Sequence, residues 1–394
     1  YVRVGQKLAR GEGSITCEVH ATVSGTVLSL DPMPELFGND LPVIRIENDG
    51  KMEVDPTLAP RTAEDLAAFV EDLHESGIVG LGGAAFPVDW KFDAALRNNV
   101  KTMLINGAEC EPYVTSDNRM MLDHGEDIRR GIELLRKYVK PDNFVFAIEN
   151  NKPHAIAAMK ELFADDPTMS IVELPSSYPQ GAKQMILYNA LGKVVYAGQR
   201  FATLGVIIIN VSTLAKVAKF MDTGMPLVDR VVTVDGSAIK EPKNLLVPIG
   251  TPYRYLVEAA GGLKCEPGRV VNGGPMMGHA VPSLDYPVLK TTGSVLVFSE
   301  ADSVIHEPTP CIHCGRCVSH CPMNLNPTAF SDDLEEENGD KRALLLDRDH
   351  VNFCIECGSC SYVCPAHRPL AENNRAAKKY LKKYKADHAE GGKK

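Results

Sequence analysis

The sequence has no long hydrophobic run, no excess of basic residues and only one tryptophan. Its apolar stretches, such as residues 206–209, have the length of buried strands, well below the roughly 18 residues that a membrane-spanning helix needs. Acidic residues outnumber basic ones by 51 to 42, which gives a formal net charge of −9. This charge disfavours a nucleic-acid binder, because binding phosphates requires a basic face. We therefore predict no direct membrane span and no nucleic-acid partner; a targeting segment before Tyr1 would lie outside the sequence.

Cysteine is scarce over most of the chain and concentrated near its C-terminus. Of the eleven cysteines, Cys17, Cys110 and Cys265 are scattered, whereas the other eight lie between Cys311 and Cys364. A secreted disulfide scaffold would be small and rich in cysteine throughout. The uneven distribution instead indicates metal ligation in a reducing compartment.

The eight clustered cysteines form an internal duplication with a displacement of 43 residues. The two copies are Cys311-x2-Cys314-x2-Cys317-x3-Cys321-Pro322 and Cys354-x2-Cys357-x2-Cys360-x3-Cys364-Pro365. Three thiolates from one tight loop can bind three corners of a [4Fe-4S] cluster, while the fourth cysteine, followed by proline, binds the other cluster. We therefore expect two crossed ligand sets: Cys311, Cys314, Cys317 and Cys364 for the first cluster, and Cys354, Cys357, Cys360 and Cys321 for the second.

Zinc is the alternative for these cysteines, but its Cys-x2-Cys pairs are usually well separated rather than arranged in runs of four. Helices are expected between the motifs, at residues 328–337 and 341–347, which resembles the helical two-cluster ferredoxin modules of respiratory enzymes. His313 and His320 would then pack near a cluster, because cysteines already fill all eight ligand positions.

The rest of the chain predicts an α/β multidomain protein. Residues 1–60 alternate apolar and polar residues around glycines, and residues 18–27 resemble the barrel-sandwich domains of biotinyl and lipoyl carriers. Those carriers present a lysine where Ser14 stands, which argues against a swinging-arm carrier. Residues 226–300 predict a β-grasp-like (SLBB) domain and residues 301–374 the helical ferredoxin domain. Residues 375–394 predict a basic, solvated and frayed tail, with a thin apolar stripe of Tyr380, Leu381 and Tyr384 as the alternative.

Residues 61–225 predict a parallel α/β domain. A capping-box-like start at residues 62–65 begins a helix that ends near Gly77. Further expected strands are residues 102–105, 144–148, 171–174 and 206–209, and further expected helices are residues 125–140, 153–163, 182–191 and 213–221. Strands separated by helices indicate a mainly parallel sheet that is covered on both faces and binds ligands at the C-terminal ends of its strands.

Two loops of this domain carry candidate binding residues. The glycine loop, residues 80–87, would bring backbone N–H groups close to a phosphate or a flat ring, and Lys91 could add a charge. The acidic loop, residues 106–112, follows an expected strand and carries the carboxylates Glu109 and Glu111. A plain tight loop and solvated acids are the alternatives.

Together the two loops resemble the flavin-binding subunit of respiratory complex I, whose Gly-Arg-Gly-Gly-Ala-Gly-Phe-Pro and Asn-Ala-Asp-Glu-Ser-Glu-Pro loops hold FMN and receive NADH. Leu81 replaces the loop arginine, and Ala182-Lys183 replaces an acidic pair after Tyr178-x-x-Gly181. The resemblance implies the following FMN- and NAD(H)-binding residues: Gly80, Gly82, Gly83, Lys91, Asn106, Glu109, Glu111, Tyr178, Gly181, Asn210 and Thr213. Phe86 is a candidate wall for a nucleotide ring, with core packing as the alternative, and Glu109 is the candidate residue that hydrogen-bonds the flavin or nucleotide.

The whole chain resembles the C subunit of the Rnf electron-transport complex in the order of these features and in the segment at residues 273–278. The resemblance implies FMN, two [4Fe-4S] clusters and NAD(H), and a peripheral position on the cytoplasmic face of the cell membrane. It further implies partnership with the membrane subunits and the ferredoxin-like B subunit of a complex that couples electron transfer to Na⁺ or H⁺ movement. The alternatives are a cobalamin reductase of similar domain order and a non-catalytic docking module with two clusters.

Overall fold

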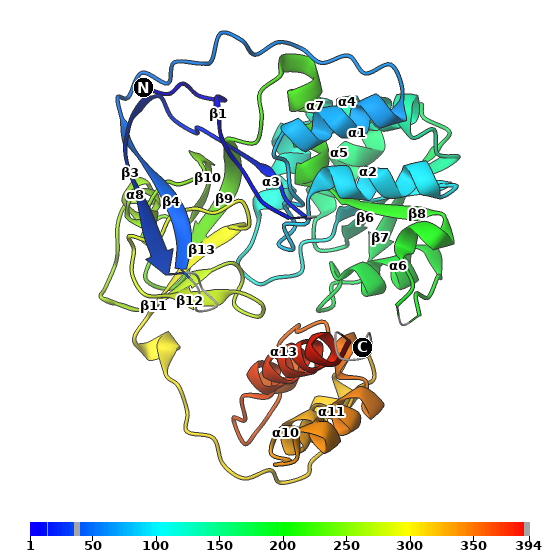
Figure 1. Cartoon of the computed structure of the whole chain (residues 1–394), viewed down its shortest axis with the longest axis vertical. Coiled ribbons are helices and arrows are strands. Elements are labelled where there is room, and N and C mark those ends of the chain that lie inside the picture. Colours follow the sequence, from blue (N-terminus) through cyan, green and yellow to red (C-terminus); the bar gives the residue numbers. More distant parts are fainter. Residues whose placement is uncertain (14, 35–39, 197, 390–394) are drawn as a thin grey trace. The chain divides into compact units, whose positions relative to one another are not determined.

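The computed structural model describes residues 1–13, 15–34, 40–196 and 198–389, which belong to two compact units, Tyr1–Ser303 and Val304–Lys394 (Figure 1). Ser14, which stands at the lysine position of the carrier domains, lies outside the described residues, as do residues 390–394. None of the helices in the described part of the chain is long and apolar enough to cross a membrane. The finer division of the first unit at residues 60 and 225 remains a prediction.

The first unit begins with two antiparallel strand pairs. Strand β1 (Lys7–Arg10) pairs with β2 (Glu18–His20), and β3 (Gly25–Pro34) pairs with β4 (Asp40–Asn48). An isolated bridge between Val2 and Gly25 joins the start of the chain to β3. These strands form the predicted barrel-sandwich start.

We expect His20, at the end of β2, to make the stability of this unit depend on pH. Burial, and then the ammonium of Lys290, lower the pKa of His20 to about 4, against an ordinary value of 6.5. Between these values the unfolded chain binds a proton that the folded chain does not, so the stability present above pH 6.5 should be lost as the pH falls toward 4, by about 3 kcal/mol. Urea unfolding at several pH values, followed by the fluorescence of Trp90, measures this loss. His20→Gln should flatten the dependence over this range, and an unchanged slope in that variant would contradict the assignment.

The centre of the first unit is a four-stranded parallel sheet in the order β7-β6-β5-β8. Its strands are β5 (Thr102–Gly107), β6 (Asn143–Glu149), β7 (Met169–Leu174) and β8 (Val206–Asn210). Its helices are α1 (Leu66–Glu75), α2 (Val88–Arg97), α3 (Ser116–Asp123), α4 (Gly125–Tyr138), α5 (Pro153–Leu162), α6 (Lys183–Leu191) and α7 (Val211–Thr223). All four predicted strands are confirmed, and so is the parallel sheet.

Alternation along the strands distributes the apolar side chains over the two faces of the sheet. Met103 and Ile105 of β5 pack into a large core with residues of α1, α4, α5 and α7, whereas Leu104 packs into a second core with Ile186 of α6. Helices α4 and α7 can approach closely because Gly131 of α4 has no side chain. A Cβ at this position would lie 2.6 Å from Leu214 of α7. The helices therefore cover both faces of the sheet, as the alternating pattern predicts.

Helix α1 begins later in the chain than the capping-box-like pattern at residues 62–65 predicts. Asp65, not Thr62, is the N-cap, because its carboxylate accepts a hydrogen bond of 2.9 Å from the Ala68 N–H. The helix ends at the C-cap Ser76, and Gly77 follows with a φ of 62°. The predicted end near Gly77 is confirmed.

A five-stranded sheet completes the first unit, in the order β10-β9-β13-β11-β12. Its strands are β9 (Asp229–Asp235), β10 (Lys243–Pro248), β11 (Pro267–Asn272), β12 (His279–Val281) and β13 (Ser294–Ser299). All pairings are antiparallel except that of β9 with β13. Helix α8 (Tyr253–Ala259) buries Tyr253 and Leu256 in the core of this sheet, which is the predicted β-grasp-like arrangement.

The second unit is helical. It contains α9 (Arg316–Ser319), α10 (Pro327–Leu334), α11 (Gly339–Arg348), α12 (Ser359–Tyr362) and α13 (Leu370–Ala389), and a short 3-10 helix at Val351–Phe353. Another 3-10 helix, Ala301–Ser303, ends the first unit. Phe330, Leu346 and Val351 are fully buried at its centre. The two predicted helices between the cysteine motifs correspond to α10 and α11.

The prediction of a frayed basic tail from residue 375 is wrong for the residues that the structure describes. Residues 375–389 belong to α13, whose Ala377 and Leu381 are buried in the core of the second unit. Tyr380 adds a hydrogen bond of 2.9 Å from its hydroxyl to the Gly339 carbonyl oxygen. Most lysines of α13 are exposed, namely Lys379, Lys382, Lys383 and Lys385. The basic composition therefore outweighed a stripe of apolar residues at helical spacing.

Candidate functional site

The first group of candidate residues lies at the C-terminal edge of the parallel sheet. Asn106 is the second-last residue of β5, Asn210 is the last residue of the neighbouring β8, and the two are partners in the register of that pair. The Asn106 amide donates to the Gly181 carbonyl oxygen at 3.0 Å, and Asn210 is the N-cap of α7. This edge is where parallel sheets bind their ligands.

The glycine loop packs directly against the N-terminus of α7. The Leu81 N–H donates to the Thr213 hydroxyl at 2.9 Å, and the Asn210 side chain accepts from the Thr213 N–H at 3.1 Å. A Cβ on Gly82 would lie 3.3 Å from the Asn210 side chain, so glycine permits this close approach. Gly82 and Gly83 are exposed, which leaves their backbone open beside a helix N-terminus, where anions bind favourably.

Lys91 extends from α2 to the base of the glycine loop. Its ammonium lies 3.5 Å from the Ile208 carbonyl oxygen, and a Cβ on Gly80 would lie at the same distance from it. Burial, and then the neighbouring charge of Lys183, lower the pKa of Lys91 to about 8. Two neighbouring cations in a desolvated position favour an anionic ligand such as a phosphate.

Glu109 caps helix α3. Its carboxylate accepts from the backbone N–H groups of Asp117 at 2.7 Å and Asn118 at 3.1 Å, and from the Ser116 hydroxyl at 3.3 Å. Burial, and then the Asp117 carboxylate, raise the pKa of Glu109. Its predicted contact with a flavin or nucleotide remains a prediction, and in the structure this side chain fixes the start of α3.

Asp117 and Arg230 hold the start of α7 and the glycine loop in place by hydrogen bonds. Neither residue was predicted from the sequence. Asp117 accepts hydrogen bonds from Asn210 at 2.6 Å and from Ser212. Arg230 is 3% exposed and donates to the carbonyl oxygens of Leu81, at 3.2 Å, and Lys290. Burial raises the pKa of Asp117 and lowers the pKa of Arg230, and the charge of each residue partly offsets this effect on the other.

Glu111 connects the acidic loop to the methionine loop, residues 273–278. Its carboxylate accepts from the N–H groups of Met276 at 3.0 Å and Met277 at 2.9 Å, and from the Tyr178 hydroxyl at 3.4 Å. A Cβ on Gly274 would lie 2.2 Å from the Glu111 carboxylate, so any larger residue there would displace that side chain. Glu111 therefore joins the parallel domain to the β-grasp-like sheet in the structure, and its role toward a cofactor remains a prediction.

Gly181, Cys110 and Phe86 complete the predicted set. Gly181 donates its N–H to the Cys110 sulfur at 3.4 Å. Burial is the main cause that raises the pKa of Cys110 to about 11. Phe86 is half-buried and contacts Trp90 edge-on at 6.2 Å between ring centroids. The Phe86 ring is therefore only partly packed in the core, and part of it remains accessible to a nucleotide ring.

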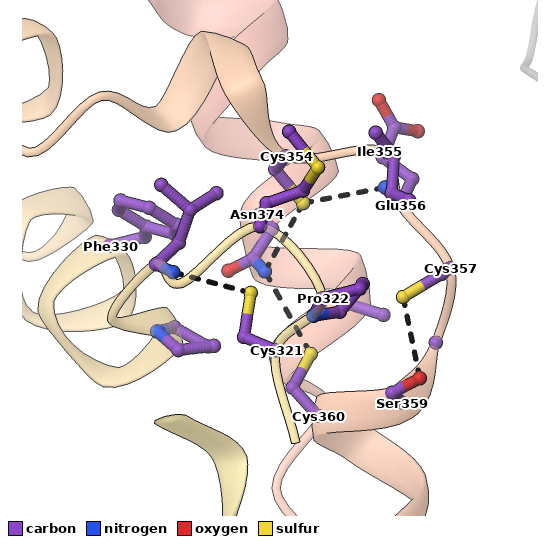
Figure 2. Close-up of a pocket in the computed structure, with 15 residues that line it drawn as sticks. Cys321, Pro322, Phe330, Cys354, Ile355, Glu356, Cys357, Ser359, Cys360 and Asn374 are labelled. Atoms are coloured by element: carbon purple, nitrogen blue, oxygen red, sulfur yellow. Dashed lines mark hydrogen bonds between the residues drawn. The ribbon is translucent and has the colours of Figure 1, made fainter. Parts of the chain in front are cut away.

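The structure brings the cysteines together in two pockets of the second unit. One pocket is lined by Cys321 with Cys354, Cys357 and Cys360 (Figure 2). The other is lined by Cys364 with Cys311, Cys314 and Cys317. Each pocket thus combines three cysteines of one motif with the fourth cysteine of the other, which is the crossed grouping that the duplication predicts.

The donor sets of both pockets suit cubane clusters. Thiolates are the ligands that iron–sulfur clusters require. Among the described residues no group of three or more His, Cys, Asp or Glu side chains could hold a single metal ion, and a cubane does not demand such a group because its four thiolates bind four different irons. Burial, and then Cys354, raise the pKa of Cys360 to about 12, so this thiol needs a metal partner to be a thiolate at neutral pH.

Four family descriptions match successive parts of the chain. They are the RnfC barrel sandwich hybrid domain over residues 1–51, the Nuo51 FMN-binding domain over residues 73–219, the SLBB domain over residues 231–280 and the 4Fe-4S dicluster domain over residues 303–365. The matches agree with the predicted fold class and with FMN and iron–sulfur clusters as cofactors. Asp117 lies within the FMN-binding match, and Arg230 lies just before the SLBB match.

Among solved structures, the NAD⁺-reducing [NiFe]-hydrogenase in the H2-reduced state has a similar fold, with a TM-score of 0.54 at 17% identity, over 80% of this chain and 63% of that chain. The C subunit of the Na(+)-translocating ferredoxin:NAD(+) oxidoreductase complex of Acetobacterium woodii is 37% identical over 86% of this chain and 77% of its own length. The C subunit of the proton-translocating ferredoxin:NAD(+) oxidoreductase complex of Clostridium ljungdahlii is 36% identical over 95% of this chain and 84% of its own length. The chain therefore belongs to the family of C subunits of ion-translocating ferredoxin:NAD(+) oxidoreductase complexes.

Proposed function

We propose that this chain is the electron-transfer subunit that exchanges electrons between ferredoxin-type clusters and NAD(H) in a membrane-associated, ion-translocating complex. The observation that carries the proposal is that one chain combines a flavin-domain fold and two pockets of four cysteines each. A bound flavin can exchange both single electrons and a hydride, which is the conversion that such a chain requires.

The residues at the sheet edge would bind and orient FMN. The exposed backbone of Gly82 and Gly83, beside the N-terminus of α7, suits a phosphate, and Lys91 supplies a positive charge at the same loop. Asn106, Tyr178, Gly181 and the acids Glu109 and Glu111 lie at the same edge and are the candidates that orient the ring system and NAD(H). No general base is needed, because a hydride passes directly between rings.

The proposed partners follow from the family. We place the chain peripherally on the cytoplasmic face of the membrane, in contact with the membrane subunits and a ferredoxin-like B subunit. The complexes to which the named relatives belong are called proton-translocating and Na⁺-translocating, and either ion fits this proposal.

Reconstitution with FMN tests the flavin site. In the full chain with its iron restored, Lys91→Glu should weaken FMN binding about 10- to 100-fold, the equivalent of one charge-assisted hydrogen bond, and should lower NADH:ferricyanide activity in parallel. Quenching of flavin fluorescence on binding gives the affinity.

Lys101→Glu is the matched control, because the exposed Lys101 precedes β5 at the opposite end of the sheet. It should bind FMN like the unaltered chain. Failure of the unaltered chain to bind FMN would reject the proposal and favour a docking module with two clusters.

A further inference from the structure

Asn374 occupies a distinctive place in the pocket of the second ligand set. It lies on α13, is 2% exposed, and its amide donates to two cysteine sulfurs, Cys354 at 3.6 Å and Cys360 at 3.8 Å (Figure 2). Both distances suit hydrogen bonds to sulfur, whose radius exceeds that of oxygen. One buried side chain thus contacts two predicted ligands of the same cluster.

Neighbouring residues of α13 fix the position of this amide. Arg375 and Lys378 form ion pairs with Glu356, which lies in the cysteine loop between Cys354 and Cys357. Lys378 also donates to the Cys354 carbonyl oxygen at 2.9 Å. The helix is therefore attached to the cysteine loop directly after Asn374, and the Asn374 amide is held toward the sulfurs.

The duplicated half of the domain lacks this donor. Displacement by 43 residues relates Asn374 to Ser331, whose hydroxyl instead accepts a hydrogen bond of 3.0 Å from the amide of Asn373. The backbone bonds recur in both halves: the Glu356 N–H lies 3.4 Å from the Cys354 sulfur, and the His313 N–H lies 3.4 Å from the Cys311 sulfur. The His313 ring nitrogen Nδ1 also lies 4.0 Å from the Cys311 sulfur, and the Leu325 N–H donates to the Cys321 sulfur at 3.3 Å. The cysteine sulfurs of the two sites thus have different hydrogen-bond partners, and the second site has the buried amide of Asn374 among them.

We propose that Asn374 raises the reduction potential of the cluster bound by Cys354, Cys357, Cys360 and Cys321, so that two duplicated motifs hold clusters of different potential. One-electron reduction adds negative charge to a thiolate-ligated cluster and breaks no bond. An N–H donor aimed at the sulfurs stabilises the added charge, so it favours the reduced form. Asn374 would act as a positioning residue that tunes the cluster without binding iron. The inference deepens the proposed function, on which it rests.

Redox titration of the purified full chain, followed by electron paramagnetic resonance, tests this inference. Asn374→Leu keeps the volume and removes the donor. We expect full iron content and a shift of about tenfold in the reduction equilibrium of one cluster toward the oxidised form, which is about 59 mV for a one-electron couple. The other cluster should keep its potential. Because neither FMN nor NADH is added, a failure of the proposed hydride transfer would leave this result unaffected.

Asn373→Ala is the matched control, since it removes an amide from the same helix that hydrogen-bonds Ser331 and no sulfur. It should leave both potentials unchanged, and Asn374→Gln, which keeps an amide, should recover part of the shift. Equal shifts in Asn374→Leu and Asn373→Ala, or no shift in Asn374→Leu, would overturn the inference. If Asn374→Leu loses iron, the test moves to Asn374→Ser, which keeps a shorter donor. A lowered potential of the affected cluster in Asn374→Ser would support the inference. Loss of the cluster in both variants, or an unchanged potential in Asn374→Ser, would overturn it.

Discussion

Replacing Cys321 by alanine should remove half of the iron of the protein, and adding Cys354→Ala to that variant should remove no more. The reason is that Cys321 and Cys354 line the same pocket although they belong to different motifs, so both changes affect one cluster. By contrast, Cys321→Ala combined with Cys311→Ala should remove nearly all iron, because Cys311 lines the other pocket. Iron and acid-labile sulfide per chain measure the outcome.

Cys265→Ala is the control for this series, because Cys265 is exposed and lies outside both motifs. It should keep full iron content. If each motif bound its own cluster, the two double variants would exchange their results: Cys321 with Cys311 would cost half of the iron, and Cys321 with Cys354 nearly all of it. The comparison therefore separates crossed from uncrossed ligation without assigning any spectroscopic signal.

Periodicity predicted the parallel sheet because its strands are continuous apolar runs that only a doubly covered sheet accommodates. The same reasoning did not predict α2 and α3. Helix α3 is polar on average and owes its start to Glu109, which lies outside the helix. The tail was misjudged for the opposite reason, because the lysines of α13 outweigh its few buried residues, among them Leu381.

The candidate site likewise contains residues that a local sequence motif predicts and residues whose role depends on contacts with segments distant in sequence. Asn210 and Thr213 were predicted from the resemblance to the flavin-binding subunit of complex I, and the structure places Asn210 beside Gly82 and Thr213 against Leu81. Asp117 and Arg230 could not be predicted, since a charged residue in a loop-proximal helix or a strand normally faces water. Their burial depends on Leu81 and Lys290, which are distant in sequence.

Arg230 joins three segments of the first unit around the glycine loop. Its guanidinium donates to the carbonyl oxygens of Leu81 and Lys290. Lys290 in turn donates from its ammonium to the carbonyl oxygens of Gly77, at 2.6 Å, and Glu18, at 2.8 Å. Strand β9, the glycine loop and the N-terminal strands are thereby held together by two cations and backbone carbonyls.

Arg230→Met should lower the free energy of unfolding of the first unit by about 2–5 kcal/mol, because the carbonyl oxygens of Leu81 and Lys290 lose their buried, charged donor. The change leaves the Asp117 carboxylate buried without its counter-charge and removes the donor of the Leu81 carbonyl. Urea unfolding followed by the fluorescence of Trp90, the single tryptophan and a residue of α2, reports on the domain concerned. Adding Asp117→Asn should recover part of the loss, because it removes the uncompensated charge while keeping one acceptor. The exposed pair of Arg254 with Asp285 provides the control: Arg254→Met should cost less than about 1 kcal/mol, and a loss as large as that of Arg230→Met would show that the buried network does not stabilise the loop.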